Sequence, residues 1–357
     1  MANENEVLLK VENLCQYFRL DANTVNKAVD NVSFDIKKGE VFGLVGESGC
    51  GKTTTGRSII KLYDITSGSV YFKGQRICAG TKSYKDAIDA AKMEKRTCKD
   101  PSRLAELDAI IEKNKAEIKS AKFDHKHADR KLVNEIQMIF QDPIASLDPR
   151  MTVRDIIAEG LVIKGIKDKE YIDNKVFDML ETVGLVREHA SRYPHEFSGG
   201  QRQRIGVARS LVMEPSLVIA DEPISALDVS IRAQIINLLN DLRNELGITI
   251  LFIAHDLSVV KYFSDRIGVM YFGKMVELAD SDELFKHPLH PYTRSLLSAI
   301  PQPDPIYERN RQRIVYNPIA DHDYRNDQPT FREVCPGHFV LCNDEEFARY
   351  QKIVEAD

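Results

Sequence analysis

The sequence of 357 residues contains no uninterrupted run of 18 apolar residues, so it predicts no membrane-spanning helix. Residues 1–5 are polar, and we expect no secretory signal peptide there. Cations are not in excess: the formal net charge is −5, which gives the chain no overall attraction for nucleic acid. Cysteine is sparse, and its six residues are scattered along the chain, as is typical of a reduced cytosolic protein.

A phosphate-binding loop is predicted at residues 46–53, which fit the pattern G-x-x-x-x-G-K-[ST]. Mostly apolar residues 40–45 before it indicate a buried strand, and residues 54–62 after it indicate a helix. The glycines let backbone N–H groups turn toward the phosphates, Lys52 is expected to reach the phosphate oxygens, and Thr53 is expected to hold Mg²⁺. The predicted nucleotide contacts are Gly46, Glu47, Ser48, Gly49, Cys50, Gly51, Lys52, Thr53 and Thr54.

Two adjacent carboxylates follow a second apolar strand. Residues 217–220 lead directly into Asp221 and Glu222, at the C-terminal strand end where ligands of α/β sheets bind. Asp221 is expected to orient the water shell of Mg²⁺, and Glu222 to act as the general base that polarises the attacking water. Together with the phosphate-binding loop, this pair predicts binding and hydrolysis of a nucleoside triphosphate.

A further apolar strand, residues 248–254, ends at His255. A single histidine is usually a structural or surface residue. Because His255 occupies the same kind of strand end as Glu222, we expect it to face the γ-phosphate.

These motifs, in this order, resemble those of the ATP-binding cassette (ABC) family over roughly residues 7–300. The family signature is usually Leu-Ser-Gly-Gly-Gln, and residues 197–201 read Phe-Ser-Gly-Gly-Gln. The resemblance implies that Ser198, Gly199, Gly200 and Gln201 start a helix whose N-terminus faces the ATP bound by another subunit. The residue types agree, because serine is a good N-cap and a glycine pair permits close approach to a phosphate.

The resemblance implies roles for three further positions. Gln141 corresponds to the glutamine that touches Mg²⁺ and reports to the membrane subunit, and Asp228 ends the stretch 225–228 that matches the D-loop. Phe18 corresponds to the aromatic residue that stacks on adenine, with Tyr17 beside it as the alternative. Ordinary core packing is the competing explanation for an aromatic side chain at this place.

Within the family, the chain resembles the ATPase of importers for oligopeptides or dipeptides. Residues 287–293 read His-Pro-Leu-His-Pro-Tyr-Thr, a stretch typical of that subfamily. Pro288 and Pro291 restrict the backbone, so we expect a fixed turn and no catalytic role for the histidines. The same subfamily also serves nickel and oligosaccharide importers, which remain alternatives.

Residues 80–133 depart from the family pattern, in which a short connection is usual, and predict an inserted helical hairpin. Asp100 and Pro101 form an N-cap and first-turn pair for its second helix. With fourteen Lys or Arg and ten Asp or Glu in residues 80–132, the hairpin is either a solvated arm or a docking arm for a membrane subunit, a regulator or a lipid headgroup. A coiled-coil seam is predicted along the second helix at Leu104, Leu107, Ile111, Asn114, Ile118 and Ala121.

The C-terminal residues also depart from the family pattern. Prolines at 301, 303 and 305 are expected to break the chain ahead of a polar tail of about fifty residues. Relatives often carry four cysteines here that could hold an iron–sulfur cluster, whereas this chain has Cys335 and Cys342. Because four thiolates are the usual requirement, we expect no cluster. The addition of His338 to the two cysteines does not predict a closed metal site.

The predicted fold class is α/β: a P-loop ABC cassette with an antiparallel edge sheet, a helical subdomain, an inserted helical hairpin and a C-terminal extension. The cassette is placed at residues 1–79 and 134–280, with the helical subdomain at about 143–213. The hairpin occupies residues 80–133, and a peptide-importer-type extension occupies residues 281–357.

The sequence thus predicts an ATPase, with ATP and Mg²⁺ as cofactors, that powers a membrane importer for oligopeptides or dipeptides. One P-loop and one signature imply a second ATPase subunit, and the resemblance favours a paralogue in a heterodimer over a homodimer. It also implies two membrane permease subunits, an extracytoplasmic solute-binding protein as an indirect partner, and a place at the cytoplasmic face of the cell membrane. An ABC ATPase without membrane partners, acting in translation or DNA maintenance, is the alternative from another class.

Overall fold

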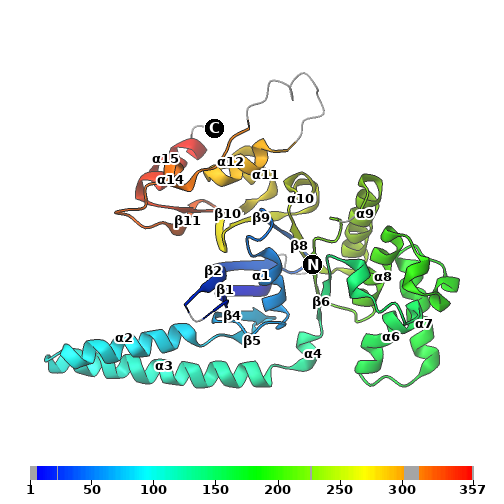
Figure 1. Cartoon of the computed structure of the whole chain (residues 1–357), viewed down its shortest axis with the longest axis horizontal. Coiled ribbons are helices and arrows are strands. Elements are labelled where there is room, and N and C mark those ends of the chain that lie inside the picture. Colours follow the sequence, from blue (N-terminus) through cyan, green and yellow to red (C-terminus); the bar gives the residue numbers. More distant parts are fainter. Residues whose placement is uncertain (1–5, 22, 226, 301–312, 356–357) are drawn as a thin grey trace. The chain divides into compact units, whose positions relative to one another are not determined.

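The computed structural model describes residues 6–21, 23–225, 227–300 and 313–355 (Figure 1). The chain divides into two compact units. The first comprises residues 1–37, 49–133 and 272–274, and the second comprises residues 38–48, 134–271 and 275–357. The prolines predicted to break the chain after residue 300 and the polar residues 1–5 lie outside the described residues.

An antiparallel sheet is the basis of the first unit, as predicted. Its strands lie in the order β2-β1-β4-β5, and each neighbouring pair is antiparallel. In β2, Val32, Phe34 and Ile36 are buried and alternate with more exposed neighbours, because successive side chains of a strand point to opposite faces. Helix α1 packs against β1 and β2. The bounds are β1 (Val7–Arg19), β2 (Val25–Lys37), α1 (Lys52–Ile59), β4 (Ser67–Phe72) and β5 (Gln75–Ala79).

The predicted helical hairpin is confirmed, and it follows β5 directly. It consists of α2 (Lys82–Thr97) and α3 (Pro101–His127), whose 27 residues span about 40 Å at 1.5 Å per residue. The Asp100 side chain accepts the N–H of Ser102 at 3.0 Å, so the predicted N-cap forms. Every residue of the predicted seam is buried or partly buried. An apolar cluster joins the two helices and consists of Ile88, Ala91, Leu107 and Ile111.

The C-terminal half of α3 is fixed to the rest of the first unit by polar contacts. Arg76 of β5 donates to Asp124 at 2.8 Å and to Ser120 at 2.6 Å. The Lys61 ammonium donates to the backbone carbonyl of His125 at 2.9 Å. These contacts hold the base of the hairpin, and the short helix α4 (Arg130–Val133) follows it.

The second unit is built on a sheet with the strand order β11-β12-β10-β9-β3-β8-β7-β6. Its middle is parallel: β3 pairs with β8 and β9, and β7 pairs with β6 and β8. The central strands are buried throughout and almost entirely apolar, as is typical of strands covered on both faces. The bounds are β3 (Val41–Val45), β6 (Ile136–Ile139), β7 (Leu217–Asp221), β8 (Thr249–Ala254), β9 (Arg266–Tyr271) and β10 (Lys274–Asp280).

Helices connect these strands, and the predicted helical subdomain lies between β6 and β7. Its apolar residues, such as Ile157, Val176 and Ile205, are fully or almost fully buried and belong to the main core of the unit. The subdomain contains α5 (Pro143–Ser146), α6 (Val153–Ile163), α7 (Lys169–Thr182), the 3₁₀ turns η1 (Arg187–Ser191) and η2 (Pro194–Glu196), and α8 (Gly199–Leu211). The later helices are α9 (Val229–Leu246), α10 (Leu257–Phe263), α11 (Ser281–Lys286) and α12 (Pro291–Ser298).

The C-terminal residues differ from the predicted polar tail, because they contribute two strands to the sheet of the second unit. Strand β12 (His338–Cys342) pairs antiparallel with β10 through Glu277 and Leu278, and β11 (Thr330–Cys335) pairs with β12. Two helices, α14 (Pro318–Asp321) and α15 (Asp344–Glu355), accompany them. Both strands are short, and charged residues interrupt β11, so composition alone does not show them. No described helix is long and apolar enough to cross a membrane.

Candidate functional site

The predicted phosphate-binding loop connects the buried strand β3 to α1. Three glycines in it have positive φ angles, namely 149° at Gly46, 80° at Gly49 and 106° at Gly51. Glycine adopts such angles without the steric penalty of a side chain, and this freedom lets the loop turn its N–H groups inward. Gly51 is the N-cap of α1, and its carbonyl accepts the N–H of Thr55 at 2.9 Å. The loop thus ends on a helix N-terminus, a favourable place for a phosphate.

The cation of the loop is Lys52, the first residue of α1, and it is 3% exposed. Its ammonium lies 3.7 Å from the sulfur of Cys50. Burial raises the pKa of the Cys50 thiol, so Cys50 is a compact neutral residue at this turn. Thr53 and Thr54 follow in the first turn of α1, and both are partly buried.

Three predicted site residues from three neighbouring strands meet at one oxygen. The Gln141 amide nitrogen lies 3.1 Å from Oε2 of Glu222, and Nδ1 of His255 lies 3.3 Å from the same atom. Gln141 follows β6, Glu222 follows β7 and His255 follows β8, and these strands are parallel neighbours. Their C-terminal ends therefore share one edge of the sheet. A carboxylate only accepts hydrogen bonds, so both neighbours donate to it.

The two adjacent carboxylates differ in exposure. Asp221 is the last residue of β7 and is fully buried, whereas the Glu222 side chain is 13% exposed. Glu222 has a positive φ of 43°, and its N–H donates to the carbonyl of Ile253 at 3.0 Å. The chain turns sharply here, so consecutive residues place one carboxylate inside the sheet and one at its surface.

The predicted signature segment begins α8 with a reciprocal capping box. The Ser198 hydroxyl accepts the N–H of Gln201 at 3.3 Å, and the Gln201 side chain accepts the N–H of Ser198 at 3.1 Å. Gly200 lies against α9, where an added Cβ would be 2.6 Å from Ile231. Phe197, which stands where leucine is usual, is buried beside the His189 ring.

The stretch that resembles the D-loop lies beside Glu222. The Ser225 hydroxyl donates to the backbone carbonyl of Glu222 at 3.1 Å. Asp228 is the N-cap residue of α9, but its side chain makes no capping hydrogen bond and is exposed. Ala226, between them, lies outside the described residues.

The two candidate adenine-stacking residues have different surroundings. Phe18 is partly buried. Its ring contacts the ring of Tyr63, which follows α1, in an edge-to-face arrangement with the ring centres 5.2 Å apart. The Tyr17 hydroxyl donates to Asp30, and Lys27 lies 5.4 Å from the centre of the Tyr17 ring. Burial and the Asp30 contact raise the pKa of Tyr17. Tyr17 is thus held by its own sheet, whereas Phe18 lies against the chain that leaves the phosphate-binding loop.

A contact that the sequence does not predict joins the C-terminal extension to the predicted phosphate-binding loop. The N–H of Glu47 donates to the hydroxyl of Tyr292 at 3.0 Å. Tyr292 is buried and packs against Tyr271 with ring centres 4.4 Å apart. His290 caps α12 by accepting the N–H of Tyr292 at 3.1 Å, which agrees with the predicted turn. Burial lowers the pKa of His290 to about 3, so its ring is neutral near pH 7.

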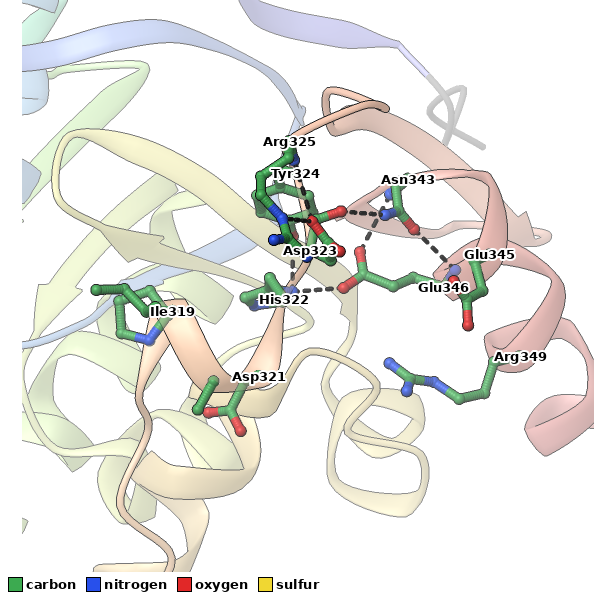
Figure 2. Close-up of a pocket in the computed structure, with 12 residues that line it drawn as sticks. Ile319, Asp321, His322, Asp323, Tyr324, Arg325, Asn343, Glu345, Glu346 and Arg349 are labelled. Carbon is green, nitrogen blue, oxygen red and sulfur yellow. Dashed lines mark hydrogen bonds and ion pairs between the residues drawn. The ribbon is translucent and has the colours of Figure 1, made fainter.

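A separate cavity of about 700 Å³ lies in the C-terminal extension, lined by residues 318–325 and by the start of α15 (Figure 2). At its wall, Nδ1 of His322 lies 2.5 Å from Glu346 and 2.8 Å from the Tyr324 hydroxyl. Asn343 donates to the carbonyl of Asp323 at 3.1 Å. None of the residues predicted to bind nucleotide lines this cavity.

The fold and the arrangement at the sheet edge agree with the comparisons to known proteins. The family described as "ABC transporter" matches residues 29–225, and the chain belongs to this family. A second family description, "Oligopeptide/dipeptide transporter, C-terminal region", matches residues 276–339. The resemblance predicted from the motifs is therefore confirmed for the ATPase and for the C-terminal stretch.

Two curated relatives match almost the whole chain. The oligopeptide transport ATP-binding protein OppF of Bacillus subtilis (strain 168) is 55% identical over 346 residues, which are 97% of this chain and 99% of the relative. The dipeptide transport ATP-binding protein DppF of Lactococcus lactis subsp. cremoris (strain MG1363) is 47% identical over 352 residues, or 98% of each chain.

Solved structures support the fold class. CbiO1 from Clostridium perfringens, described as part of the ABC transporter complex cbiONQ, has a TM-score of 0.57 at 25% identity, covering 80% of this chain and 92% of its own. The ATP-binding cassette MJ0796, solved as a dimer in a post-hydrolysis state bound to ADP and Pi, has a TM-score of 0.57 at 25% identity, covering 77% of this chain and 99% of its own. The predicted α/β cassette is confirmed.

Proposed function

We propose that this chain is the ATP-hydrolysing subunit of an importer for oligopeptides or dipeptides. The assignment as an ATPase rests on two hydrogen bonds to the same oxygen of Glu222, one from Gln141 and one from His255. The peptide part is supported by the C-terminal family match at residues 276–339 and by the names of the two relatives.

Glu222 is the general base in this proposal. Its carboxylate is partly exposed and accepts from Gln141 and His255, so it is oriented before water arrives. A positioned base of this kind takes the proton as the attacking water bonds to the γ-phosphate. The His255 side chain is 52% exposed, which leaves it room to turn toward the phosphate when nucleotide is present.

Magnesium is the metal that the residues at this edge fit. Asp221 ends β7 and Gln141 follows β6, so parallel pairing brings two oxygen-bearing side chains to the same edge. Thr53 supplies a hydroxyl from the first turn of α1. Mg²⁺ bound there would neutralise phosphate charge. Lys52 and the loop N–H groups hold the β- and γ-phosphates, and the Phe18 ring stacks on the base.

A second ATPase subunit completes each site in this proposal. The capping box satisfies the N–H of Gln201, whereas the N–H groups of Gly199 and Gly200 sit in the first turn of α8, where a helix offers no carbonyl partner. These groups, with Ser198, are suited to the γ-phosphate held by another subunit. The exposed Asp228 side chain belongs to the same contact surface.

The further partners follow from the peptide-importer assignment. Two permease subunits in the membrane receive the motion near Gln141, and an extracytoplasmic binding protein delivers the solute to them. The ATPase partner is a paralogue, and the chain is held at the cytoplasmic face of the cell membrane by the permeases.

An uptake assay tests the assigned substrate. Cells that lack this chain should lose uptake of a radiolabelled tripeptide, and expression of the intact chain should restore it. Uptake of nickel and of a labelled maltotriose should not change. Loss of nickel or maltotriose uptake with normal tripeptide uptake would replace the peptide assignment by the corresponding alternative.

The composite site predicts a selective effect of Ser198→Arg. A bulky cation at the start of α8 should block the ATP site of the partner, so hydrolysis by the assembled complex should fall while this chain still binds ATP at its own loop. Nucleotide affinity of the isolated chain and turnover of the complex are the two measurements. Ser102→Arg, in the exposed first turn of α3, is a matched control. If Ser198→Arg abolished ATP binding by the isolated chain, the composite site would be wrong.

A further inference from the structure

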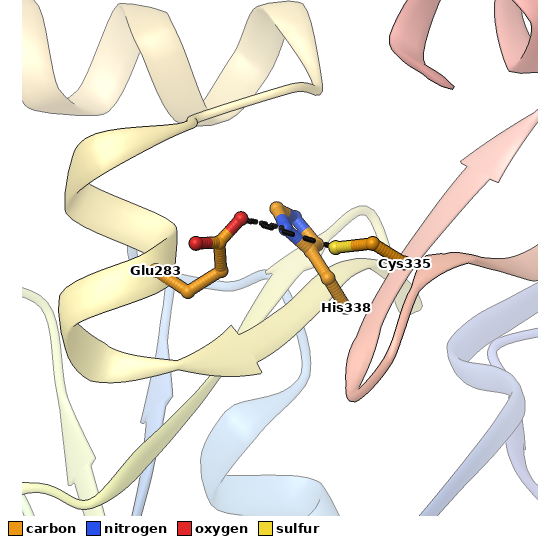
Figure 3. A group of neighbouring side chains, drawn as sticks. All are labelled: Glu283, Cys335 and His338. Atoms are coloured by element: carbon orange, nitrogen blue, oxygen red, sulfur yellow. Dashed lines mark hydrogen bonds and ion pairs between the residues drawn. The ribbon is translucent and has the colours of Figure 1, made fainter. Parts of the chain in front are cut away.

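Three potential metal ligands converge where the C-terminal extension meets α11 (Figure 3). Glu283 lies on α11, Cys335 ends β11 and His338 begins β12. Oε1 of Glu283 lies 3.9 Å from the sulfur of Cys335 and 3.3 Å from Nδ1 of His338. All three ligand atoms lie within 4.8 Å of one another. The turn between the two strands, which pairs Cys335 with His338, places both side chains toward the same carboxylate.

These separations are close to the distances between neighbouring ligand atoms in a tetrahedral metal site. Zinc bonds of about 2.0–2.3 Å in a tetrahedron give ligand-to-ligand distances of about 3.3–3.8 Å. The 3.3 Å between Oε1 of Glu283 and Nδ1 of His338 matches that range, and the 3.9 Å between Oε1 of Glu283 and the sulfur of Cys335 exceeds it by little. The ligand atoms of Cys335 and His338 lie within 4.8 Å of each other, so a metal ion at the centre would draw these two side chains together.

The His338 ring is oriented as metal-binding histidines usually are. Its Nε2 lies 2.9 Å from Oε1 of Glu277, and both side chains are fully buried. Because a carboxylate only accepts, Nε2 carries a proton, and Nδ1 is the nitrogen directed at Glu283. Glu277 is itself fixed by the N–H groups of Leu289 at 2.7 Å and His290 at 3.1 Å. A carboxylate behind the ligating imidazole fixes the tautomer and ring orientation of such sites.

A second histidine orients the Glu283 carboxylate. Nδ1 of His287 lies 2.9 Å from Oε1 of Glu283, a hydrogen-bond distance shorter than a ligand-to-ligand edge. His287 is thus a hydrogen-bond donor to the ligand. With three protein ligands, the fourth coordination position belongs to water.

We propose that Glu283, Cys335 and His338 bind one divalent metal ion of the zinc class. A thiolate, an imidazole and a carboxylate together suit zinc, whereas magnesium and calcium prefer oxygen ligands alone. A single thiolate is too few for an iron–sulfur cluster. Cys342, the other cysteine of the extension, takes no part, because its sulfur donates to the carbonyl of Val340 within the core.

The ion would cross-link α11 to the turn between β11 and β12. Glu283 and Cys335 are 52 positions apart in sequence, so a shared metal closes a long loop. The apolar cluster that holds this part of the extension together has five buried members, Leu289, Val334, Val340, Cys342 and Tyr350. Small cores of this kind are often reinforced by a structural metal.

Metal content of the full-length, untagged and nucleotide-free chain tests the proposal. After loading with zinc and exhaustive dialysis, the wild-type chain should retain about one zinc per chain by elemental mass spectrometry. Cys335→Ala and Glu283→Gln should each lose most of it. Cys342→Ala is the matched control and should keep the zinc, since it removes a thiol from the same pair of strands but no ligand. Thermal melts identify any variant that fails to fold.

Cobalt loading provides a second, spectroscopic readout that does not depend on ATPase activity. The wild-type chain and Cys342→Ala should show a near-ultraviolet thiolate-to-cobalt band, and Cys335→Ala should lack it while still folded. The Glu277→Gln variant should bind zinc about 10–100-fold more weakly, because Glu277 orients the ligand His338. Absence of retained zinc in the wild type, or equal retention in Cys335→Ala, would overturn the proposal. His338 would then be a hydrogen-bonding link between Glu277 and Glu283.

Discussion

Glu222→Gln is expected to abolish ATP turnover while ATP remains bound. The amide keeps the shape of the side chain and its contacts with Gln141 and His255, but it cannot accept a proton from water. Loss of a positioned general base lowers a rate by about 10²–10⁴. In the proposed composite site ATP holds the two subunits together and hydrolysis separates them, so the ATP-bound pair of subunits should then accumulate. Single-turnover hydrolysis by the assembled complex and size-exclusion chromatography with ATP are the measurements.

Glu245→Gln is a suitable control for this experiment. Glu245 is exposed near the end of α9, and the same change of charge there should leave turnover unaltered. Normal steady-state hydrolysis by the Glu222→Gln complex would remove Glu222 from its proposed role. It would also leave the convergence of Gln141 and His255 without a catalytic explanation.

Lys52→Ala is expected to remove most ATP binding. Lys52 is the side-chain cation of the phosphate-binding loop, and a hydrogen bond to a charged group contributes roughly 1.5–3 kcal/mol. That loss corresponds to a binding constant about tenfold to a hundredfold weaker. Titration with a fluorescent ATP analogue measures the change directly on the isolated chain.

The control for this variant is Lys38→Ala, which removes an exposed cation from the segment just before β3. It should bind the analogue as the wild type does. Because Lys52 is buried, a thermal melt should accompany the titration to show that Lys52→Ala is folded. Unchanged affinity in a folded Lys52→Ala chain would contradict the assignment of residues 46–53 to phosphate binding.

The sequence predicts well those parts of the fold that depend on interactions within a short, continuous segment. The phosphate-binding loop needs glycine at defined places, and the φ angles of Gly49 and Gly51 show why. Ser198 caps α8 because its hydroxyl reaches an N–H three residues later, which is a local event. The hairpin likewise follows from the spacing of its own apolar residues, such as Leu107 and Ile111.

What the sequence does not predict is contact between distant segments. Strand β12 is only five residues long, and its pairing with β10 joins residues 339 and 278, which no local pattern connects. The hydrogen bond from Glu47 to Tyr292 spans 245 positions. The sequence does not indicate Glu283 as a ligand for the same reason, because only the folded chain brings it to Cys335 and His338. Pairing between distant segments depends on packing in the folded chain, and the local pattern of residue types in the sequence does not indicate it.

The pairing of β12 with β10 has a consequence for solubility. Strand β10 contains five consecutive buried residues, 275–279, four of them apolar, and without β12 one side of it would present unpaired N–H and C=O groups. Such an edge is a template for aggregation between chains. With the extension in place, the terminal strand of the sheet is β11, a short strand whose Arg332 pairs with Asp344. A charged, short edge strand resists pairing with another chain. The C-terminal strands therefore also protect this sheet from edge-to-edge pairing with another copy of the chain.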